Sequence, residues 1–535
     1  MTLIGPGLHR HPHALYIYSF PWAMGAFVPM NAFLAPIIPL YSIEFAYQRA
    51  RELVEPNYGY FAVGVLVMGL LLYSILSYLV LAIMTLVKLR RGNIELLIPS
   101  IWTHARSILK GDPGELFDLV MPDLKASKGL LGWLSPVGKP FVVIQDEKVL
   151  EQVLVKNASN LTKHHAFGVL ELFRRTDLPS GDAWKVVHRV ASRFSVNNGE
   201  LQQKLEVMLK QYCAACEQLS KGEIKGDFAE FTKTFYWDLV LLMVLGDAND
   251  HKLSALYKDA WMACIAALGS PLAHTLSFFT YLPLPGVVRY RVLTHKLRTI
   301  IAAKIHQRQA PTWTVLGVIR DRMSESDQLE IAMEFMFTGA SSVTSSLIWL
   351  IRHMACDEAM CDKIREEVIQ VADKHGTSWL DGQQASECKV VDAALRETLR
   401  LYSPIHIGRL SMREFNVVNT AGEKVTFPAH CDIMSNLWFM QRDPDNWPDP
   451  TRFDHTRFVD KPNNVPNYHP FSMGIRGCPG QRIAYSVIKM VAANVALRYK
   501  LRPLPDPPAE PCFERNLMLP VTPKHIYLEF ERLRK

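Results

Sequence analysis

At 535 residues the chain is too long for one small core, and its content of 49% apolar and 21% charged residues is that of a globular protein. This composition excludes a disordered chain and a multispan transporter. The formal net charge of +7 is modest for the length, and no basic run points to nucleic acid; it suits an anionic membrane surface or an acidic protein partner.

The first predicted element is a membrane helix. Residues 61–87 contain no charged residue, and the basic sequence KLRR follows at 88–91. About 20 apolar residues span a bilayer as a helix, and flanking basic residues stay in the cytosol. We therefore expect a transmembrane helix at 61–87, a basic linker at 88–100 and a cytosolic remainder. The preceding residues 1–60 are apolar but rich in proline, so a second span there stays open.

Beyond residue 100, helical patterns dominate. Apolar residues recur at three- and four-residue spacing over 200–219, 292–308 and 361–375. Short β-like runs occur at 141–146, 423–428 and 525–530, and the chain shows no internal repeat. The nine cysteines are scattered, which favours a reducing compartment with free thiols. We predict one mainly α domain with small β-sheets over residues 101–535.

The sequence FSMGIRGCPG at 471–480 holds one cysteine in a frame of glycines and an arginine. A thiolate is a strong iron ligand but needs a loop that keeps it ionised and shielded. Gly474 and Gly480 allow positive φ and close backbone approach around Cys478. Arg476 can reach a carboxylate on the ligand that the sulfur faces, and Phe471 can exclude water from the sulfur.

The frame F-x-x-G-x-R-x-C-x-G resembles the heme-binding signature of the cytochrome P450 family, with all five fixed positions present. The resemblance implies the cytochrome P450 fold after an N-terminal membrane anchor, with heme b as cofactor. It makes Cys478 the axial ligand of the heme iron. The alternative is a buried structural cysteine in a glycine loop.

The resemblance also implies a buried network behind the cysteine loop. The sequence ETLR places Glu397 and Arg400 three residues apart, so they share one face of a helix. Downstream, FDHTRF resembles the family's P-E-R-F segment and retains Arg457. The three side chains are expected to lock the cysteine loop against the core, which is a structural role.

Further positions are assigned to the cofactor and the substrate by the same resemblance. Trp184 and His188, in GDAWKVVHR, and Arg409, in LYSPIHIGRL, are candidates to hold the heme propionates. A histidine is only partly charged near neutrality, so His188 is a departure from the family's basic residue. The substrate pocket is expected to include the following three residues: Ile405, His406 and Ile407.

The segment FMFTGASSVTSSLIWLI, residues 335–351, resembles the family's long central helix. Gly339 suggests a bulge or close approach, because glycine within a helix costs about 1 kcal/mol relative to alanine. Ser342 takes the place of the usual threonine and Ser341 that of the usual acid. Cleavage of the O–O bond needs protons delivered to the distal oxygen, so the catalytic candidates are Gly339, Ser341 and Ser342.

Two enzymatic mechanisms and one binding role remain open. In the preferred one, a monooxygenase receives electrons from an NADPH–cytochrome P450 reductase and oxidises a lipophilic terpenoid, steroid, fatty-acyl or polyketide-like molecule, as in fungal secondary metabolism. In the second, an isomerase or dehydratase acts on a peroxide without a reductase. The third is a non-catalytic heme protein of the membrane. We expect the endoplasmic reticulum membrane as location and the reductase docking on Arg482 and Lys489.

Substrate entry is expected from the membrane. Residues 265–286 are apolar with turn residues, and they fall where the resemblance implies a roof over the pocket. This segment can dip into the bilayer and admit a lipophilic substrate, or it can simply pack in the core.

Overall fold

The computed structural model describes most of the chain after residue 55. The described residues are 56–96, 127, 129–134, 140–163, 190, 199–222, 227–247, 250–268, 284–403, 407–435, 437–462, 464–504, 513–514 and 521–533. The chain divides into two compact units, Met1–Leu79 and Val80–Lys535. The predicted positions Trp184, His188, Ile405 and His406 lie outside the described residues.

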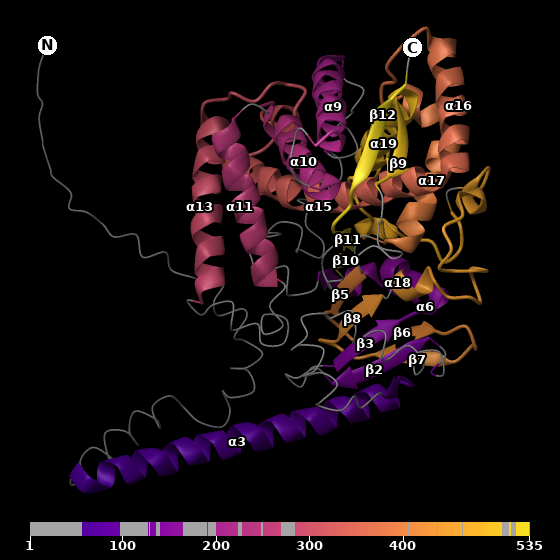
Figure 1. Ribbon diagram of the computed structural model, residues 1–535. Helices are drawn as coiled ribbons and strands as arrows, with labels where there is room; N and C mark the ends of the chain where they lie inside the picture. Colours follow the sequence, from indigo (N-terminus) through magenta and orange to yellow (C-terminus); the bar gives the residue numbers. More distant parts are fainter. Residues whose placement is uncertain are drawn as a thin grey trace, which may run out of the picture. The chain divides into compact units, whose positions relative to one another are not determined.

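Helices make up most of the described part (Figure 1). The α-helices are α3 (Pro56–Arg91), α6 (Glu147–Glu151), α9 (Gly199–Ser220), α10 (Phe228–Leu245), α11 (His251–Leu268), α13 (Pro285–His306), α14 (Val315–Ile319), α15 (Glu325–Cys356), α16 (Glu358–His375), α17 (Lys389–Leu401), α18 (Leu437–Met440) and α19 (Gln481–Arg498). Short non-α helices are η1 (Gln152–Lys156), η2 (Ala158–Asn160), η4 (Gln384–Glu387), η5 (His455–Phe458) and η6 (Gly474–Arg476).

The strands form four small sheets. They are β1 (Glu95–Leu96), β2 (Leu130–Leu134), β3 (Pro140–Ile144), β4 (Leu161–Lys163), β5 (Ile407–Ser411), β6 (Phe415–Val418), β7 (Lys424–Phe427), β8 (Asp432–Ser435), β9 (Tyr499–Pro503), β10 (Phe513–Glu514), β11 (Thr522–Pro523) and β12 (Leu528–Arg532). The largest sheet has the order β1-β2-β3-β8-β5-β4, and three two-stranded sheets pair β6 with β7, β9 with β12 and β10 with β11. A mainly helical fold with small sheets is therefore confirmed.

The predicted elements match the observed ones closely where the pattern is strong. The periodic segments 200–219 and 361–375 are α9 and α16, and 292–308 is the later part of a longer helix, α13. The strand predicted at 525–530 begins only at Leu528, because residues 521–527 are mostly irregular.

Capping side chains fix where the long helices begin. The Ser324 hydroxyl accepts a hydrogen bond from the Asp327 amide at the start of α15, and the Asp357 carboxylate accepts one from the Met360 amide at the start of α16. Gly376 adopts a left-handed conformation and ends α16. In the fold, α15 runs through the centre of the helical part (Figure 1).

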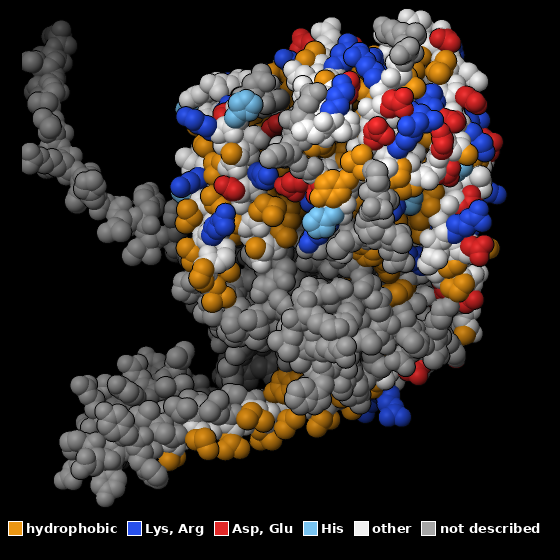
Figure 2. All heavy atoms as spheres, viewed as in Figure 1, with side chains coloured by type: hydrophobic (Ala, Val, Ile, Leu, Met, Phe, Trp, Pro, Cys, Tyr) orange, Lys and Arg blue, Asp and Glu red, His pale blue; other side chains and the backbone are white. Residues whose placement is uncertain are grey.

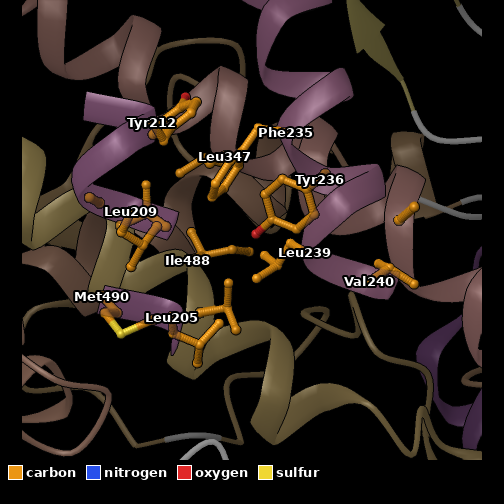
Figure 3. Packing of buried hydrophobic residues seen from close by; sticks show 14 of the residues in the cluster. Leu205, Leu209, Tyr212, Phe235, Tyr236, Leu239, Val240, Leu347, Ile488 and Met490 are labelled. Atoms are coloured by element: carbon orange, nitrogen blue, oxygen red, sulfur yellow. The ribbon is translucent and has the colours of Figure 1, made fainter. Parts of the chain in front are cut away.

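The main core lies where α9, α10, α15 and α19 converge (Figure 3). The periodic residues Leu201, Leu205 and Leu209 of α9 are at most 1% exposed, which explains the three- and four-residue spacing. Each fully buried leucine contributes roughly 1.5–3 kcal/mol. A second cluster, around Val142, Ile144 and Leu150, covers the larger sheet.

The N-terminal helix α3 contains the predicted span. Its exposed side chains include Val65, Leu72, Ile75 and Ile83, all apolar. By the length and hydropathy that a membrane crossing requires, none of the helices within the described residues qualifies as a span.

Candidate active site

Cys478 lies in a tight loop that directly precedes α19. The Cys478 amide donates to the Phe471 carbonyl at 2.8 Å, and the Gly477 amide donates to the Gly474 carbonyl at 3.0 Å. Gly474 has φ +72°, and a Cβ there would come within 2.6 Å of the Leu154 carbonyl oxygen. Only glycine fits this position, because the backbone is left-handed and another backbone lies directly against it.

Gly480 has a different role from the one expected. Its φ is −84°, so it does not adopt the predicted positive φ. A Cβ at Gly480 would lie 3.9 Å from the Cys478 sulfur, which is an ordinary contact distance. Gly480 is the N-cap of α19, so Cys478 stands two residues before the positive end of an 18-residue helix. Such a position favours the ionised thiolate, and Cys478 is exposed.

The cysteine loop is held from two sides by side chains that sequence reasoning missed. The Gln441 side-chain oxygen accepts from the His469 amide at 3.1 Å, and its amino group donates to the Arg400 carbonyl at 3.0 Å. Glu147 of α6 accepts from the His469 ring and from the Asn467 amide, both at 2.7 Å. The bond to His469 lowers the pKa of Glu147. No local motif marks these residues.

The structure brings Glu397, Arg400 and Arg457 together. Arg400 donates to both Glu397 oxygens, at 2.7 Å and 2.8 Å, and both side chains are fully buried. The Arg457 Nε lies 3.5 Å from the Glu397 carboxylate. Burial raises the pKa of Glu397, whereas the two bonds from Arg400 oppose that shift. The pair is therefore buried and bidentate, not a solvated surface pair.

Arg400 also ties this network to the segment that leads to the cysteine loop. Its guanidinium donates to the carbonyls of Gln441 and Pro450, at 2.6 Å and 2.8 Å. The Asp454 amide completes the arrangement by donating to Glu397 at 2.9 Å. Arg400 and Glu397 thus both join α17 to residues 441–454 through bonds to the backbone there.

Two guanidinium groups converge near the loop. Burial and the neighbouring positive charge of Arg476 lower the pKa of Arg409 to about 10. Arg409 stands in β5, and its guanidinium donates to the Gly408 carbonyl at 2.8 Å. Like charges at a buried site are stabilised by an anion between them. The pair therefore fits a ligand that carries carboxylates.

The central part of α15 presents hydroxyl groups. Thr338 is exposed, and Gly339, Ser341 and Ser342 are half-buried, whereas the helix from Thr344 to Leu350 is buried. α15 is continuously helical here, so the expected bulge at Gly339 is not present, and the space beside Gly339 is open. The Ser342 hydroxyl lies 3.5 Å from the Thr338 carbonyl, at the limit of a hydrogen bond, so it can turn toward another acceptor.

Ser345 and Ser346, which follow on the same helix, have different partners. The Ser346 hydroxyl donates back to the Ser342 carbonyl at 2.9 Å, as simple helix packing predicts. The Ser345 hydroxyl instead donates to the Val521 carbonyl at 2.6 Å, beside β11. Ser345 is thus an anchor between distant segments.

The remaining predicted residues divide between core and surface. Ile407 is buried at the start of β5. Arg482 is exposed on the first turn of α19. The prediction that Lys489 belongs to a docking surface is wrong, because Lys489 is 7% exposed and its amino group lies 3.1 Å from the Asp392 carboxylate.

Comparison with known proteins identifies the class of this arrangement. The family model described as cytochrome P450 matches residues 99–530. The chain therefore belongs to the cytochrome P450 family, whose cofactor is heme b.

Individual relatives match over shorter stretches. The chain is 29% identical over 215 residues to cytochrome P450 4A10 of Mus musculus, which is 40% of each chain. It is 31% identical over 186 residues to probable cytochrome P450 4d20 of Drosophila melanogaster, covering 34% of this chain and 36% of that protein. Similarity to cytochrome P450 78A3 of Glycine max is 27% over 191 residues, covering 34% and 36%. The chain thus spans well under half the length of these curated relatives.

Proposed function

We propose that the protein is a heme-thiolate monooxygenase that inserts one oxygen atom from O2 into a lipophilic small molecule. The observation that carries this proposal is Cys478, held by a constrained loop immediately before the positive end of α19. A thiolate in that position binds iron and donates electron density to it. When bound, the heme supplies the activation of dioxygen.

The chain's own residues hold and orient that cofactor. Cys478 would bind the heme iron, while Arg409 and Arg476 would neutralise the heme propionates. Such an anion would oppose both the burial and the repulsion by Arg476 that lower the pKa of Arg409. Trp184 and His188 are proposed as additional propionate partners. The network of Glu397, Arg400 and Arg457 keeps the loop in place without touching the reacting atoms.

Ser342 is the proposed proton donor of α15, with Ser341 beside it and Gly339 opening the space that they face. The loosely bonded Ser342 hydroxyl can orient a water molecule and pass a proton along it. Ser341 stands where the family carries an acid. Water or a substrate hydroxyl therefore delivers the proton that a carboxylate would deliver. Proton delivery therefore depends on hydroxyl groups in this protein.

Replacing Ser342 with alanine is expected to uncouple the reaction: oxygen and NADPH are still consumed, but the yield of product per NADPH falls. Loss of one positioned proton donor typically costs about 10²–10⁴-fold in the step that it assists. The matched control is Ser346→Ala, since that hydroxyl bonds only within its own helix. Equal coupling in the two variants would remove Ser342 from the proposed relay.

The second candidate is an isomerase or dehydratase that acts on a peroxide substrate. The observation that favours it is a serine, not a carboxylate, at position 341. The two functions differ in their electron source. NADPH-dependent turnover with a reductase, tested on a panel of lipophilic precursors, supports the monooxygenase; turnover of a hydroperoxide without any electron donor supports the alternative. A heme protein that turns over neither is the non-catalytic case.

The substrate is proposed to be a terpenoid, steroid, fatty-acyl or polyketide-like molecule, with Ile405, His406 and Ile407 in its pocket. Exposed apolar side chains gather over α11 and α13 (Figure 2): Met262, Leu284, Val288 and Val292. They flank residues 269–283, the middle of the segment proposed to touch the bilayer. A lipophilic substrate can enter from such a surface.

Membrane attachment is proposed through residues 61–87, at the endoplasmic reticulum. The apolar, exposed surface of α3 and its terminal residues Lys88, Arg90 and Arg91 support this proposal. The full chain, expressed in a eukaryotic cell, should stay in the membrane pellet after alkaline carbonate washing. Release into the supernatant would contradict a transmembrane anchor. Arg482 remains a proposed contact of the NADPH–cytochrome P450 reductase, since it is exposed beside the cysteine loop.

A further inference from the structure

Beside the proposed oxygen-handling stretch, a buried indole stacks on a phenol. Trp349 lies on α15, two helical turns after Ser342, and is fully buried. Its ring is parallel to that of Tyr402, with centroids 3.6 Å apart and an angle of 4° between the planes. Tyr402 is the C-cap of α17, directly after the buried Glu397–Arg400 pair. The stack thus joins the two helices behind the candidate site.

The Tyr402 hydroxyl is hydrogen-bonded to a histidine. Its oxygen lies 3.2 Å from the His353 Nε2, and the two rings are 5.6 Å apart. Burial, together with the charge of Arg352, lowers the pKa of His353 to about 3. At neutral pH the imidazole is therefore uncharged, so its Nε2 can accept a hydrogen bond from the Tyr402 hydroxyl. It is a weak base, and it takes up the proton only when Tyr402 is oxidised, because an oxidised phenol is a very strong acid.

Two buried tyrosines of the described core, unlike the half-buried Tyr402, have different partners. Tyr257 donates to the Met336 carbonyl, and Tyr212 is bonded to the Thr232 hydroxyl at 2.9 Å. A carbonyl or an alcohol is a far weaker base than even this imidazole, so neither takes up the proton of an oxidised phenol. The pairing of Tyr402 with an imidazole is thus chemically distinct.

The stack continues toward the surface on its other side. The Arg442 guanidinium lies 5.7 Å from the centre of the Tyr402 ring and 3.2 Å from that of Trp438, which is half-buried. This fixed positive charge disfavours a second positive charge on the Tyr402 ring. Oxidation of Tyr402 is therefore favourable only if its proton leaves together with the electron.

We propose that Trp349, Tyr402 and His353 form a redox relay that carries an oxidising equivalent away from the heme site to Tyr402. A one-electron oxidant, here the heme after reaction with a hydroperoxide, removes one electron from the Trp349 indole. Tyr402 returns one electron to Trp349 across the stack, and its phenolic proton moves to the His353 Nε2. The products are restored Trp349, a neutral Tyr402 radical and a His353 imidazolium. A thiol reductant then supplies one electron, and the proton returns from His353 to the phenolate oxygen.

The relay goes beyond the proposed function, because it operates when no substrate takes up the oxidising equivalent. It discharges that equivalent at a half-buried ring, which spares the cysteine loop and the porphyrin from oxidation. It depends on heme binding but not on the identity of the substrate or on the reductase.

The test is electron paramagnetic resonance of the heme-loaded full chain, frozen after brief reaction with cumene hydroperoxide. We expect a persistent tyrosyl radical signal. Tyr402→Phe, which keeps the stack, should lose most of that signal; His353→Phe should lose it too, although Tyr402 is still present. Tyr257→Phe is the matched control and should keep it. Formation in D2O should be slower, because a proton moves with the electron.

The relay is overturned if Tyr402→Phe keeps the full signal, if His353→Phe keeps it, or if the unsubstituted protein shows neither the radical nor a solvent isotope effect.

A photo-oxidised ruthenium tris-bipyridine complex provides a second, heme-independent oxidant for the same variants. If the heme signal fails but the ruthenium oxidant gives a persistent radical lost in Tyr402→Phe, the stack functions and the proposed heme chemistry is at fault. Heme bleaching by the hydroperoxide should be faster in Tyr402→Phe than in Tyr257→Phe; equal rates would contradict a protective role.

Discussion

Arg400→Met is expected to destabilise the protein more than any other single substitution considered for this chain. It leaves the Glu397 carboxylate buried without its bidentate partner and removes the donor to the Gln441 and Pro450 carbonyls. Breaking a buried pair in this way costs about 3–5 kcal/mol, against a total stability of about 5–15 kcal/mol for a typical domain. The urea midpoint of the detergent-solubilised full chain and the yield of heme-loaded protein should both fall sharply.

A surface pair of the same kind provides the control. Arg502 and Glu531 lie 3.3 Å apart on β9 and β12, with side chains 51% and 53% exposed. Exposed pairs contribute about 0–1 kcal/mol, so Arg502→Met should leave the urea midpoint almost unchanged. If the two variants unfold at the same urea concentration, the network of Glu397, Arg400 and Arg457 does not stabilise this protein in the way that its burial implies.

Cys478→Ser is expected to abolish both the thiolate spectrum and monooxygenase activity. A serine hydroxyl stays protonated at neutral pH. It therefore carries no negative charge that the positive end of α19 could stabilise. The measurement is the absorption spectrum of the reduced, CO-bound protein, together with product formation. Because the loop is maintained by backbone bonds and by Gly474, the fold itself should survive the substitution.

The control for Cys478 is another exposed cysteine. Cys356, at the end of α15, is also a free and exposed thiol among the described cysteines. Cys356→Ser removes the same sulfur chemistry at a position away from the loop, so it should keep both spectrum and activity. If Cys356→Ser lost the thiolate spectrum and Cys478→Ser kept it, the iron ligand would be Cys356 and not Cys478.

Features that depend on contiguous residues could be predicted from the sequence. The loop around Cys478 is defined within ten residues, and the helices α9 and α16 follow from apolar spacing alone. The pair of Glu397 and Arg400 could be placed on one helix face, and the family resemblance supplied its burial. In each case the determining interactions are local or carried by a motif.

Features that depend on distant segments could not be predicted. The bond between Glu147 and His469 joins residues 322 apart in the chain, and no pattern marks either residue. The bond from Ser345 to Val521 joins residues 176 apart. Lys489 was predicted to lie on a docking surface, yet α19 is buried from Val487 to Ala496. A lysine within that run needs the acidic partner that Asp392 provides.

The central claim is that Cys478 binds heme iron as a thiolate, and one spectrum tests it most directly. The purified, heme-loaded full chain is reduced with dithionite and exposed to CO. The account predicts the red-shifted Soret band of a thiolate-ligated heme. A Soret band in the position typical of histidine or water ligation, from protein that retains its fold, would contradict it.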